Sequence, residues 1–314
     1  MDGVDYSLRP MIHQNTDTLQ GLIVAAYGRE YEVRIKGWGA NSPTLMCSPR
    51  GKKSLYACGD EVEVIALTES QGVIEALLPR RSLLYRADAF KEKLIAANVT
   101  QVVIVAATEP GFSDELLMRC LCAVESQNIT GVIVLNKCDL QTHLKRGRDS
   151  LAPFAQLGHP VLQLSAHTGD LEELRRHLAG HVSLLVGQSG MGKTTLINAL
   201  VPDTAARTGV VSEVLNSGKH TTTHARWYDL PGGGALIDSP GLQAFGLAHL
   251  SGEQIENGFR EFRELRGQCK FRDCQHAQEP HCAYRAALAA GTIDARRFQV
   301  FQSLLIEHRK KTKY

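Results

Sequence analysis

The residues with the clearest chemical role lie near the middle of the chain, where positions 187–194 read GQSGMGKT. This stretch fits G-x-x-x-x-G-K-[ST], in which the glycines let successive backbone N–H groups point at phosphate oxygens. Lys193 is placed to reach the β- and γ-phosphates of a nucleotide, and the Thr194 hydroxyl is placed to ligate Mg²⁺. Apolar residues 181–186 predict a buried strand before the loop, and residues 195–200 predict a helix after it. The predicted nucleotide contacts here are Gly187, Gln188, Ser189, Gly190, Met191, Gly192, Lys193, Thr194 and Thr195.

A second motif, Asn136-Lys137-Cys138-Asp139, follows an apolar strand predicted over residues 130–135. The pattern N-K-x-D reads guanine, because the Asp carboxylate accepts hydrogen bonds from N1–H and from the exocyclic amine. Adenine has no donor at either place, and a site built for these bonds rejects it strongly. We expect Asn136 to hold the phosphate-binding loop and the stem of Lys137 to lie on the base.

Three further segments complete a predicted GTP site. Ser165-Ala166-His167 follows a strand predicted over residues 160–164 and matches S-A-[KHL], whose backbone N–H reads guanine O6. Residues 238–241 (DSPG) match D-x-P-G, in which Asp238 would hold Mg²⁺ through water and the Gly241 N–H would contact the γ-phosphate. The segment between the loop and D-x-P-G is the place of the first switch, where a threonine ligates Mg²⁺ while the γ-phosphate is present. The candidates are Thr221, Thr222 and Thr223, and the sequence does not choose among them.

The order of these motifs is unusual. Ordinary GTPases begin with the phosphate loop, whereas here N-K-x-D and S-A-x come first. The motifs can still surround one nucleotide, because a sheet is indifferent to where the chain is cut if the new termini lie at the surface. The sequence therefore predicts a circularly permuted P-loop GTPase domain, whose second switch leads directly into the C-terminal segment.

That segment contains Cys269, Cys274, His276 and Cys282, in the pattern Cys-x4-Cys-x-His-x5-Cys. Three thiolates and an imidazole suit tetrahedral Zn²⁺ and close its coordination shell, so we expect one structural zinc. His281 competes with His276 for the fourth place. The other five of the eight cysteines are scattered, and we expect them to be packing residues.

The elements that must position these motifs divide into three domains of an α/β protein. After a polar N-terminus at 1–18, which we expect to be flexible, short strands within residues 19–80 indicate a closed β-barrel of the OB type. A polar, basic connector spans residues 79–93. Residues 95–250 alternate buried strands with helices, which predicts a parallel α/β sheet for the GTPase domain. Residues 251–314 predict a mainly helical zinc-binding domain.

Composition restricts the class of protein. With 43% hydrophobic and 22% charged residues, the chain reads as soluble and globular, and we see neither an export signal nor an apolar run of the ~20 residues that span a bilayer. We therefore expect a cytoplasmic protein with no membrane partner. Net charge is +2, but residues 268–314 carry nine Lys/Arg against four Asp/Glu. This basic end suggests a polyanion contact, and an ordinary solvated tail remains open.

At this point the chain resembles the RsgA (YjeQ) family of circularly permuted small ribosomal subunit biogenesis GTPases. The similar stretches are GQSGMGKTT, HTTT, NKCD, DSPG, FGLAHL and CKFRDCQHAQEPHC. Met191, Thr194 and Thr195 stand where Val, Ser and Ser are commoner in that family. The resemblance implies a monomer that binds GTP/GDP with Mg²⁺ and docks on the small ribosomal subunit and its rRNA late in maturation. It would hydrolyse GTP to GDP and phosphate, stimulated by the subunit, and leave upon hydrolysis.

Catalysis is expected to use Lys193, Thr223 and His249. Many GTPases place a glutamine after D-x-P-G to orient water, but here that position is Leu242. The FGLAHL segment resembles a family segment whose histidine is proposed for this role, which makes His249 the candidate. The alternative is that His249 contacts the partner from the surface. At the level of the whole protein, the alternative function is an RNA-binding module ordered by GTP with little turnover, and a GTPase acting on membranes or on tRNA is disfavoured.

Overall fold

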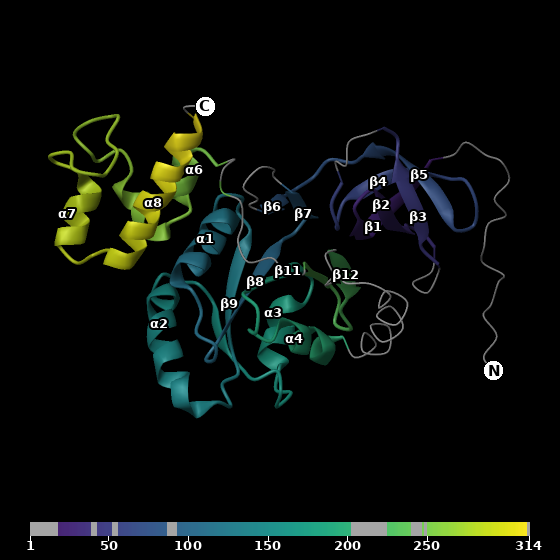
Figure 1. The fold of residues 1–314 in the computed structure, drawn as a ribbon, viewed down its shortest axis with the longest axis horizontal. Coiled ribbons are helices and arrows are strands. Elements are labelled where there is room, and N and C mark those ends of the chain that lie inside the picture. The colour runs from purple at the N-terminus through teal and green to yellow at the C-terminus, as the bar shows by residue number, and fades with distance from the viewer. Residues whose placement is uncertain are drawn as a thin grey trace.

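The fold was analysed in a computed structural model of the chain, drawn in Figure 1. The structure describes residues 18–38, 43–51, 56–86, 93–201, 225–239, 247 and 250–312. Within this part of the chain, strands and helices form a barrel, a sheet covered by helices on both faces, and a helical C-terminal domain. These are the three parts that the sequence predicts.

The N-terminal barrel has five strands, and its OB-type architecture is confirmed. The strands run in the order β1-β2-β3-β5-β4, and a β1–β4 pairing closes the barrel. On β2, Tyr31, Val33 and Ile35 are buried while the residues between them are not, so one face fills the core. The five strands are β1 (Leu19–Tyr27), β2 (Glu30–Ile35), β3 (Leu45–Pro49), β4 (Glu61–Ala66) and β5 (Gln71–Leu77).

A two-stranded ribbon links the barrel to the rest of the molecule. It consists of β6 (Leu83–Arg86) and β7 (Lys93–Ala97), which pair antiparallel. Residues 83–86 belong to the polar connector that the sequence predicts, and here they form a strand because Leu84 is buried in the core against the GTPase domain. The ribbon therefore packs against that domain.

The central sheet brings the predicted motifs to one edge. Its strands run in the order β10-β9-β8-β11-β13-β12, all parallel except β12, and a single pair, Ala25↔Arg226, joins β12 to β1 of the barrel. The carboxyl ends of parallel strands meet at the same edge, which is where α/β sheets bind ligands. The strands are β8 (Gln101–Ala107), β9 (Thr130–Asn136), β10 (Val161–Gln163), β11 (Val182–Val186), β12 (Arg226–Asp229) and β13 (Ala235–Asp238).

Helices cover both faces of this sheet (Figure 1). Successive residues of β8 alternate between two cores: Val102 and Ile104 pack with α1 (Asp114–Glu125) and α2 (Leu144–Gln156), whereas Val103 packs on the opposite side with α3 (Glu172–Leu178) and α4 (Lys193–Leu200). The sequence analysis does not anticipate α2, which contains Gly147 and Pro153, or the short strand β12. Gly147 lies against β9, since a Cβ there would be 3.2 Å from the Leu135 side chain.

The C-terminal domain packs directly on α1. Phe259, Phe262 and Phe301 form a stacked and T-shaped aromatic cluster that belongs to the same core as α1. At the contact, Glu125 of α1 accepts hydrogen bonds from Arg260 and Arg263 at 2.6 Å. The domain comprises α6 (Gly252–Asn257), the 3-10 segment η3 (Arg260–Leu265), α7 (Ala283–Ala289) and α8 (Ala295–Thr312). A separate 3-10 turn, η2 (Gln141–His143), belongs to the GTPase domain and precedes α2. Among the described helices, none combines the length and the apolar character that a membrane span requires.

Candidate nucleotide and metal sites

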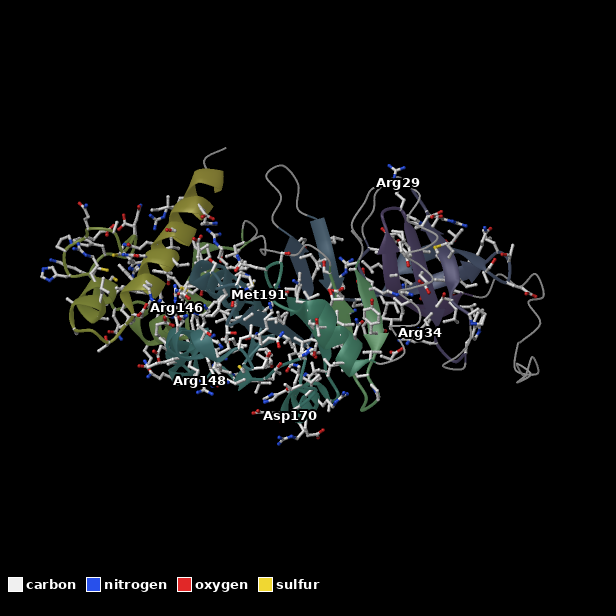
Figure 2. The ribbon with its side chains drawn as sticks, turned by 60° about the horizontal axis from the view of Figure 1, so that its bottom comes forward. Arg29, Arg34, Arg146, Arg148, Asp170 and Met191 are labelled. Carbon is white, nitrogen blue, oxygen red and sulfur yellow. The ribbon has the colours of Figure 1, made fainter. Side chains whose placement is uncertain are left out.

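The phosphate-binding motif forms a loop between β11 and α4, in the centre of the molecule, where Figure 2 labels Met191. Gly192 caps α4 with φ +88°, and a Cβ at this position would lie 2.3 Å from Nδ2 of Asn136. Only glycine therefore fits against the guanine motif here. Lys193 folds back over the loop, and its Nζ donates to the carbonyls of Gly187 at 2.7 Å and Gln188 at 2.9 Å. The Lys193 ammonium thus lies against the backbone of the loop, at the carbonyls of Gly187 and Gln188.

Asn136 connects the guanine motif with the phosphate loop, as the sequence analysis expects. Its Nδ2 donates to the carbonyl oxygen of Met191 at 2.9 Å. Its Oδ1 accepts from the backbone N–H of Ala166 at 3.0 Å, so the same side chain also holds the S-A-H segment. Asn136 is only 1% exposed, and its amide is held from both sides. One buried side chain therefore fixes three motifs that lie far apart in the sequence.

Asp139 and Ser165 lie together at the guanine end of the site. A hydrogen bond from the Ser165 side chain is the main reason that the pKa of Asp139 lies below its usual value. Asp139 is exposed, so its carboxylate is a charged acceptor open to a base. The S-A-H segment is predicted to read guanine O6 through a backbone N–H, and in this structure the N–H of Ala166 donates to Asn136. Lys137 adopts φ +61°, and its Nζ donates to the carbonyl of Glu109 at 2.8 Å.

Lys193 and Asp238 face each other across the phosphate end. Burial lowers the pKa of Lys193, and the negative charge of Asp238 acts in the opposite direction. Burial likewise raises the pKa of Asp238, and Lys193 opposes that change. A partly buried carboxyl beside an ammonium, at the end of β13, has the chemistry of a group that acts through a bound cation. Thr194 is the second residue of α4, directly after Lys193.

A loop that the sequence analysis overlooks braces both halves of this site. It follows β8, and Thr108 Oγ1 donates to the carbonyl of Lys137 at 2.9 Å. At its other end, the Ser113 N–H donates to Oε1 of Gln188 in the phosphate loop at 3.0 Å. The available signal was its position: it follows a parallel strand and therefore belongs to the edge at which the motifs meet.

Several predicted residues lie outside the part of the chain that the structure describes. These are the switch threonines Thr221, Thr222 and Thr223, together with Gly241 and His249. Their predicted roles stay predictions. Among the described candidates, Gln188, Ser189, Gly190 and Thr195 lie in the loop or first turn of α4, and Cys138 lies in the loop after β9, where its N–H donates to the carbonyl of Leu164 at 3.1 Å.

The Cys/His cluster converges in the C-terminal domain. One ligand atom from each of Cys269, Cys274, His276 and Cys282 lies within 4.8 Å of the others, whereas His281 is not part of the cluster. The sulfurs of Cys269 and Cys282 are 3.9 Å apart, and Nδ1 of His276 lies 3.6 and 3.5 Å from them. Tetrahedral Zn–S bonds of ~2.3 Å and Zn–N bonds of ~2.0 Å give edges of about 3.8 and 3.5 Å. The four side chains therefore fit a tetrahedral metal ion.

Glu256 of α6 completes the surroundings of this cluster. Its Oε1 lies 3.4 Å from Nε2 of His276, the ring nitrogen that faces away from the sulfurs. Its other oxygen accepts from the hydroxyl of Tyr284 at 3.4 Å. A carboxylate behind a ligating histidine fixes the tautomer that leaves Nδ1 free to bind metal. No sequence signal pointed to Glu256, which lies 13 positions before Cys269.

Replacing Glu256 by Gln should weaken zinc binding about 10- to 100-fold, the usual cost of losing such a supporting carboxylate. Competition with a chelator of known zinc affinity measures the change. Glu253→Gln is the matched control, because Glu253 lies one turn earlier on α6 and pairs with Arg266 instead of a metal ligand. Equal zinc affinities in the Glu256 and Glu253 variants would contradict this role.

Comparison with known proteins supports the arrangement described above. The family model described as RsgA GTPase matches residues 77–248. A small ribosomal subunit biogenesis GTPase RsgA from Nitrosospira multiformis is 50% identical over 91% of this chain and 90% of its own. The protein of the same name from Ralstonia pickettii is 48% identical over 91% of this chain and 92% of its own.

Solved structures show the same fold. The crystal structure of YjeQ from Thermotoga maritima superposes with a TM-score of 0.66 at 29% identity, covering 93% of this chain and 98% of that one. The crystal structure of YloQ, titled a circularly permuted GTPase, superposes with a TM-score of 0.69 at 25% identity, covering 96% and 98%. The permuted order of motifs read from the sequence is therefore found in a solved relative.

Proposed function

The chain belongs to the RsgA GTPase family, and from this premise we propose that it hydrolyses GTP to GDP and phosphate while bound to the small ribosomal subunit. In this proposal the protein binds the subunit late in its maturation, the subunit stimulates hydrolysis, and hydrolysis releases the protein. The relatives' name, small ribosomal subunit biogenesis GTPase, supports the partner. The site geometry supports the reaction.

One observation carries the proposal: the two hydrogen bonds of the buried Asn136 amide, to Met191 O and from Ala166 N. They tie the N-K-x-D and S-A-H segments to the phosphate loop, which supports one shared nucleotide site although the motifs occur in permuted order. Asp139 would accept from guanine N1–H and the exocyclic amine, and the loop N–H groups would hold the phosphates.

The metal ions have separate tasks in this proposal. Mg²⁺, held by Thr194, Asp238 through water and one of the switch threonines, would neutralise charge on the β- and γ-phosphates. Lys193 would leave the carbonyls of Gly187 and Gln188 to contact those phosphates. Zinc, held by Cys269, Cys274, His276 and Cys282, would be structural, since four protein ligands leave no open position.

Measuring GTP hydrolysis with and without purified small ribosomal subunits tests the function. We expect slow turnover by the protein alone and a large increase with small subunits. Co-sedimentation should show retention with a non-hydrolysable GTP analogue and loss with GDP. Equal rates with and without subunits, together with nucleotide-independent co-sedimentation, would favour the alternative of an RNA-binding module that GTP merely orders.

His249→Ala should reduce the subunit-stimulated rate by about 10²-fold, the range for a lost group that positions water, and leave GTP affinity unchanged. The reason is that Leu242, after D-x-P-G, cannot orient water by hydrogen bonding. Single-turnover hydrolysis at saturating small subunits measures the effect. An unchanged stimulated rate would assign this task to a ribosomal group or to His220 or His224.

A further inference from the structure

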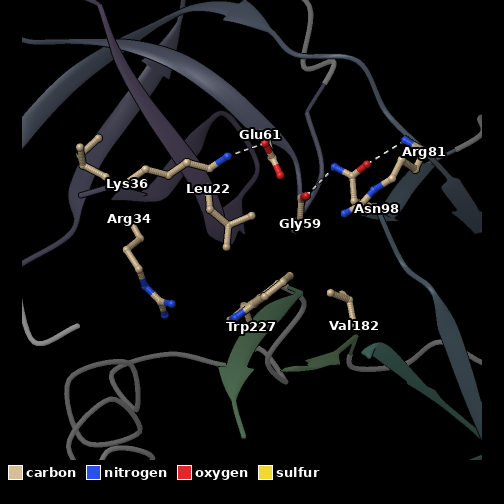
Figure 3. Close-up of a pocket in the computed structure, with 10 residues that line it drawn as sticks. Leu22, Arg34, Lys36, Gly59, Glu61, Arg81, Asn98, Val182 and Trp227 are labelled. Carbon is tan, nitrogen blue, oxygen red and sulfur yellow. Dashed lines mark hydrogen bonds and ion pairs between the residues drawn. The ribbon is translucent and has the colours of Figure 1, made fainter. Parts of the chain in front are cut away.

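A cleft separates the barrel from strands β11 and β12 of the GTPase sheet (Figure 3). Its volume is about 180 Å³, roughly 12 to 18 times the ~10–15 Å³ that one water molecule needs. Leu22, Arg34 and Lys36 line it from the barrel, and Val182 and Trp227 line it from the GTPase domain. We call this space the interdomain cleft. Its two walls belong to two domains.

The floor of the interdomain cleft is held in place by backbone contacts. The side chain of Asn98 donates to the carbonyl of Gly59 at 2.9 Å and accepts from the N–H of Arg81 at 2.8 Å. Asn98 is 6% exposed, whereas the Arg81 side chain lies at the surface. The cleft is thus formed in advance, with a cation at its rim.

One carboxylate orients the most distinctive side chains of the cleft. Asp229 accepts from Nε1 of Trp227 at 2.8 Å and makes a two-pronged ion pair with Arg34 at 3.0 and 2.7 Å. Burial works against its charge, but the hydrogen bonds from Arg34 and Trp227 outweigh burial and lower the pKa of Asp229. The indole of Trp227 and the guanidinium of Arg34 are therefore both held in the cleft wall by Asp229. A ligand that contacts them would cost little side-chain conformational entropy.

The charge of the lining is unbalanced. Three cations, Arg34, Lys36 and Arg81, line the cleft. Lys36 contacts the lining carboxylate Glu61 at 2.6 Å and Arg34 is paired with Asp229, so these five groups together carry one net positive charge. Cations beside an aromatic ring are the side chains that proteins use for single-stranded nucleic acid, because bases stack on the ring and phosphates meet the cations. An acidic peptide would satisfy the cations but would offer a ring to the indole only where it carries an aromatic side chain, whereas every nucleotide carries a base.

We propose that the interdomain cleft binds an unpaired nucleotide of RNA, with the base against Trp227 and the neighbouring phosphates beside Arg34 and Arg81. The choice of RNA rests on the proposed function, since the partner named there contains RNA. The cleft also has a route to the nucleotide site. Trp227 pairs with Ile237 in the β12–β13 ladder, and the adjacent pair joins Arg226 to Asp238. Bound RNA would therefore touch the strand next to the Mg²⁺ candidate.

The chain offers a direct optical test, because it has two tryptophans. In full-length Trp38→Phe protein, Trp227 is the single tryptophan, and adding a short single-stranded oligoadenylate RNA should change its fluorescence saturably. Trp227→Phe protein, which keeps Trp38, should show a much smaller change. Unchanged Trp227 emission at RNA concentrations that saturate binding by anisotropy would overturn the proposal, and so would the absence of any binding.

Charge variants separate the cleft from general attraction to RNA. Trp227→Ala should weaken oligoadenylate binding about tenfold, in the range for one lost base stack. Arg81→Ala should weaken it several-fold and lower the salt slope by about one. Arg29→Ala is the matched control, since Arg29 is exposed on the β1–β2 turn and Figure 2 shows it at the opposite edge of the barrel from Arg34. Equal effects of Arg81→Ala and Arg29→Ala would overturn the assignment, as would competition by polyglutamate equal to that by RNA.

The outcome can be distinguished from that of the proposed function. If small subunits stimulate GTP hydrolysis while Trp227 emission does not respond to RNA, the cleft assignment fails and the function stands. If Trp227 responds to RNA but small subunits stimulate nothing, the function fails and the cleft stands.

Discussion

Asp139→Asn is expected to move the nucleotide preference of this protein from guanine to xanthine. The carboxylate accepts from two guanine donors, and an amide can serve only one of them as an acceptor. Losing one of these hydrogen bonds, and the negative charge that strengthens the other, should lower GDP affinity roughly 10²-fold or more. Xanthine carries a carbonyl at the place of the amine, which the new amide can contact. Xanthosine diphosphate should therefore bind the variant better than GDP.

Equilibrium titration with GDP, xanthosine diphosphate and ADP measures this change. Asp149→Asn is the matched control, because Asp149 lies on α2 and forms an exposed ion pair with Lys145, which contributes little. Its nucleotide preference should equal that of the unmodified protein. If the unmodified protein binds ADP as tightly as GDP, the assignment of Asn136 to Asp139 as a guanine site is wrong.

The sequence was sufficient for most of the fold because the decisive signals are local. Apolar runs such as residues 130–135 identify buried parallel strands, and each motif then follows a strand at the same edge. The order of motifs predicted a circular permutation without any knowledge of the sheet order. The strand ends, the barrel and the phosphate loop with its helix lie in the structure close to where the patterns place them.

What the sequence did not show depends on contacts between distant segments. Thr108 gains its role from the carbonyl of Lys137, and Glu256 from the imidazole of His276. Neither residue belongs to a spacing pattern. The helix α2 was missed because Gly147 and Pro153 are poor helix formers, and only packing against Leu135 shows why a glycine stands there. Tertiary packing outweighs local propensity in each case.

Loss of zinc should unfold part of the C-terminal domain. Zinc binding contributes roughly 10–16 kcal/mol to the folding of small zinc modules, so chelation or Cys282→Ser should unfold the loop that holds the cluster, together with α7. Phe259 and Phe301 belong to the same core as α1, which should keep α6 and α8 in place. GDP affinity should therefore change little, because Asn136 and the phosphate loop lie in the GTPase domain. Elemental analysis should show one zinc per chain. Hydrogen exchange should show local unfolding when zinc is lost, and GDP titration should show intact binding.

Cys47→Ala provides the comparison for Cys282→Ser, because Cys47 is buried in the barrel core and lies outside the group of four metal-binding side chains found among the described residues. It should lower stability modestly and leave zinc content unchanged. Freshly purified protein without zinc would refute the metal assignment. Simultaneous loss of zinc and GDP binding would show instead that unfolding of the metal loop reaches the nucleotide site through α1. Helix α1 contacts the C-terminal domain through the shared aromatic core and through Glu125, which pairs with Arg260 and Arg263. The two outcomes therefore decide whether the metal stabilises one module or the whole unit.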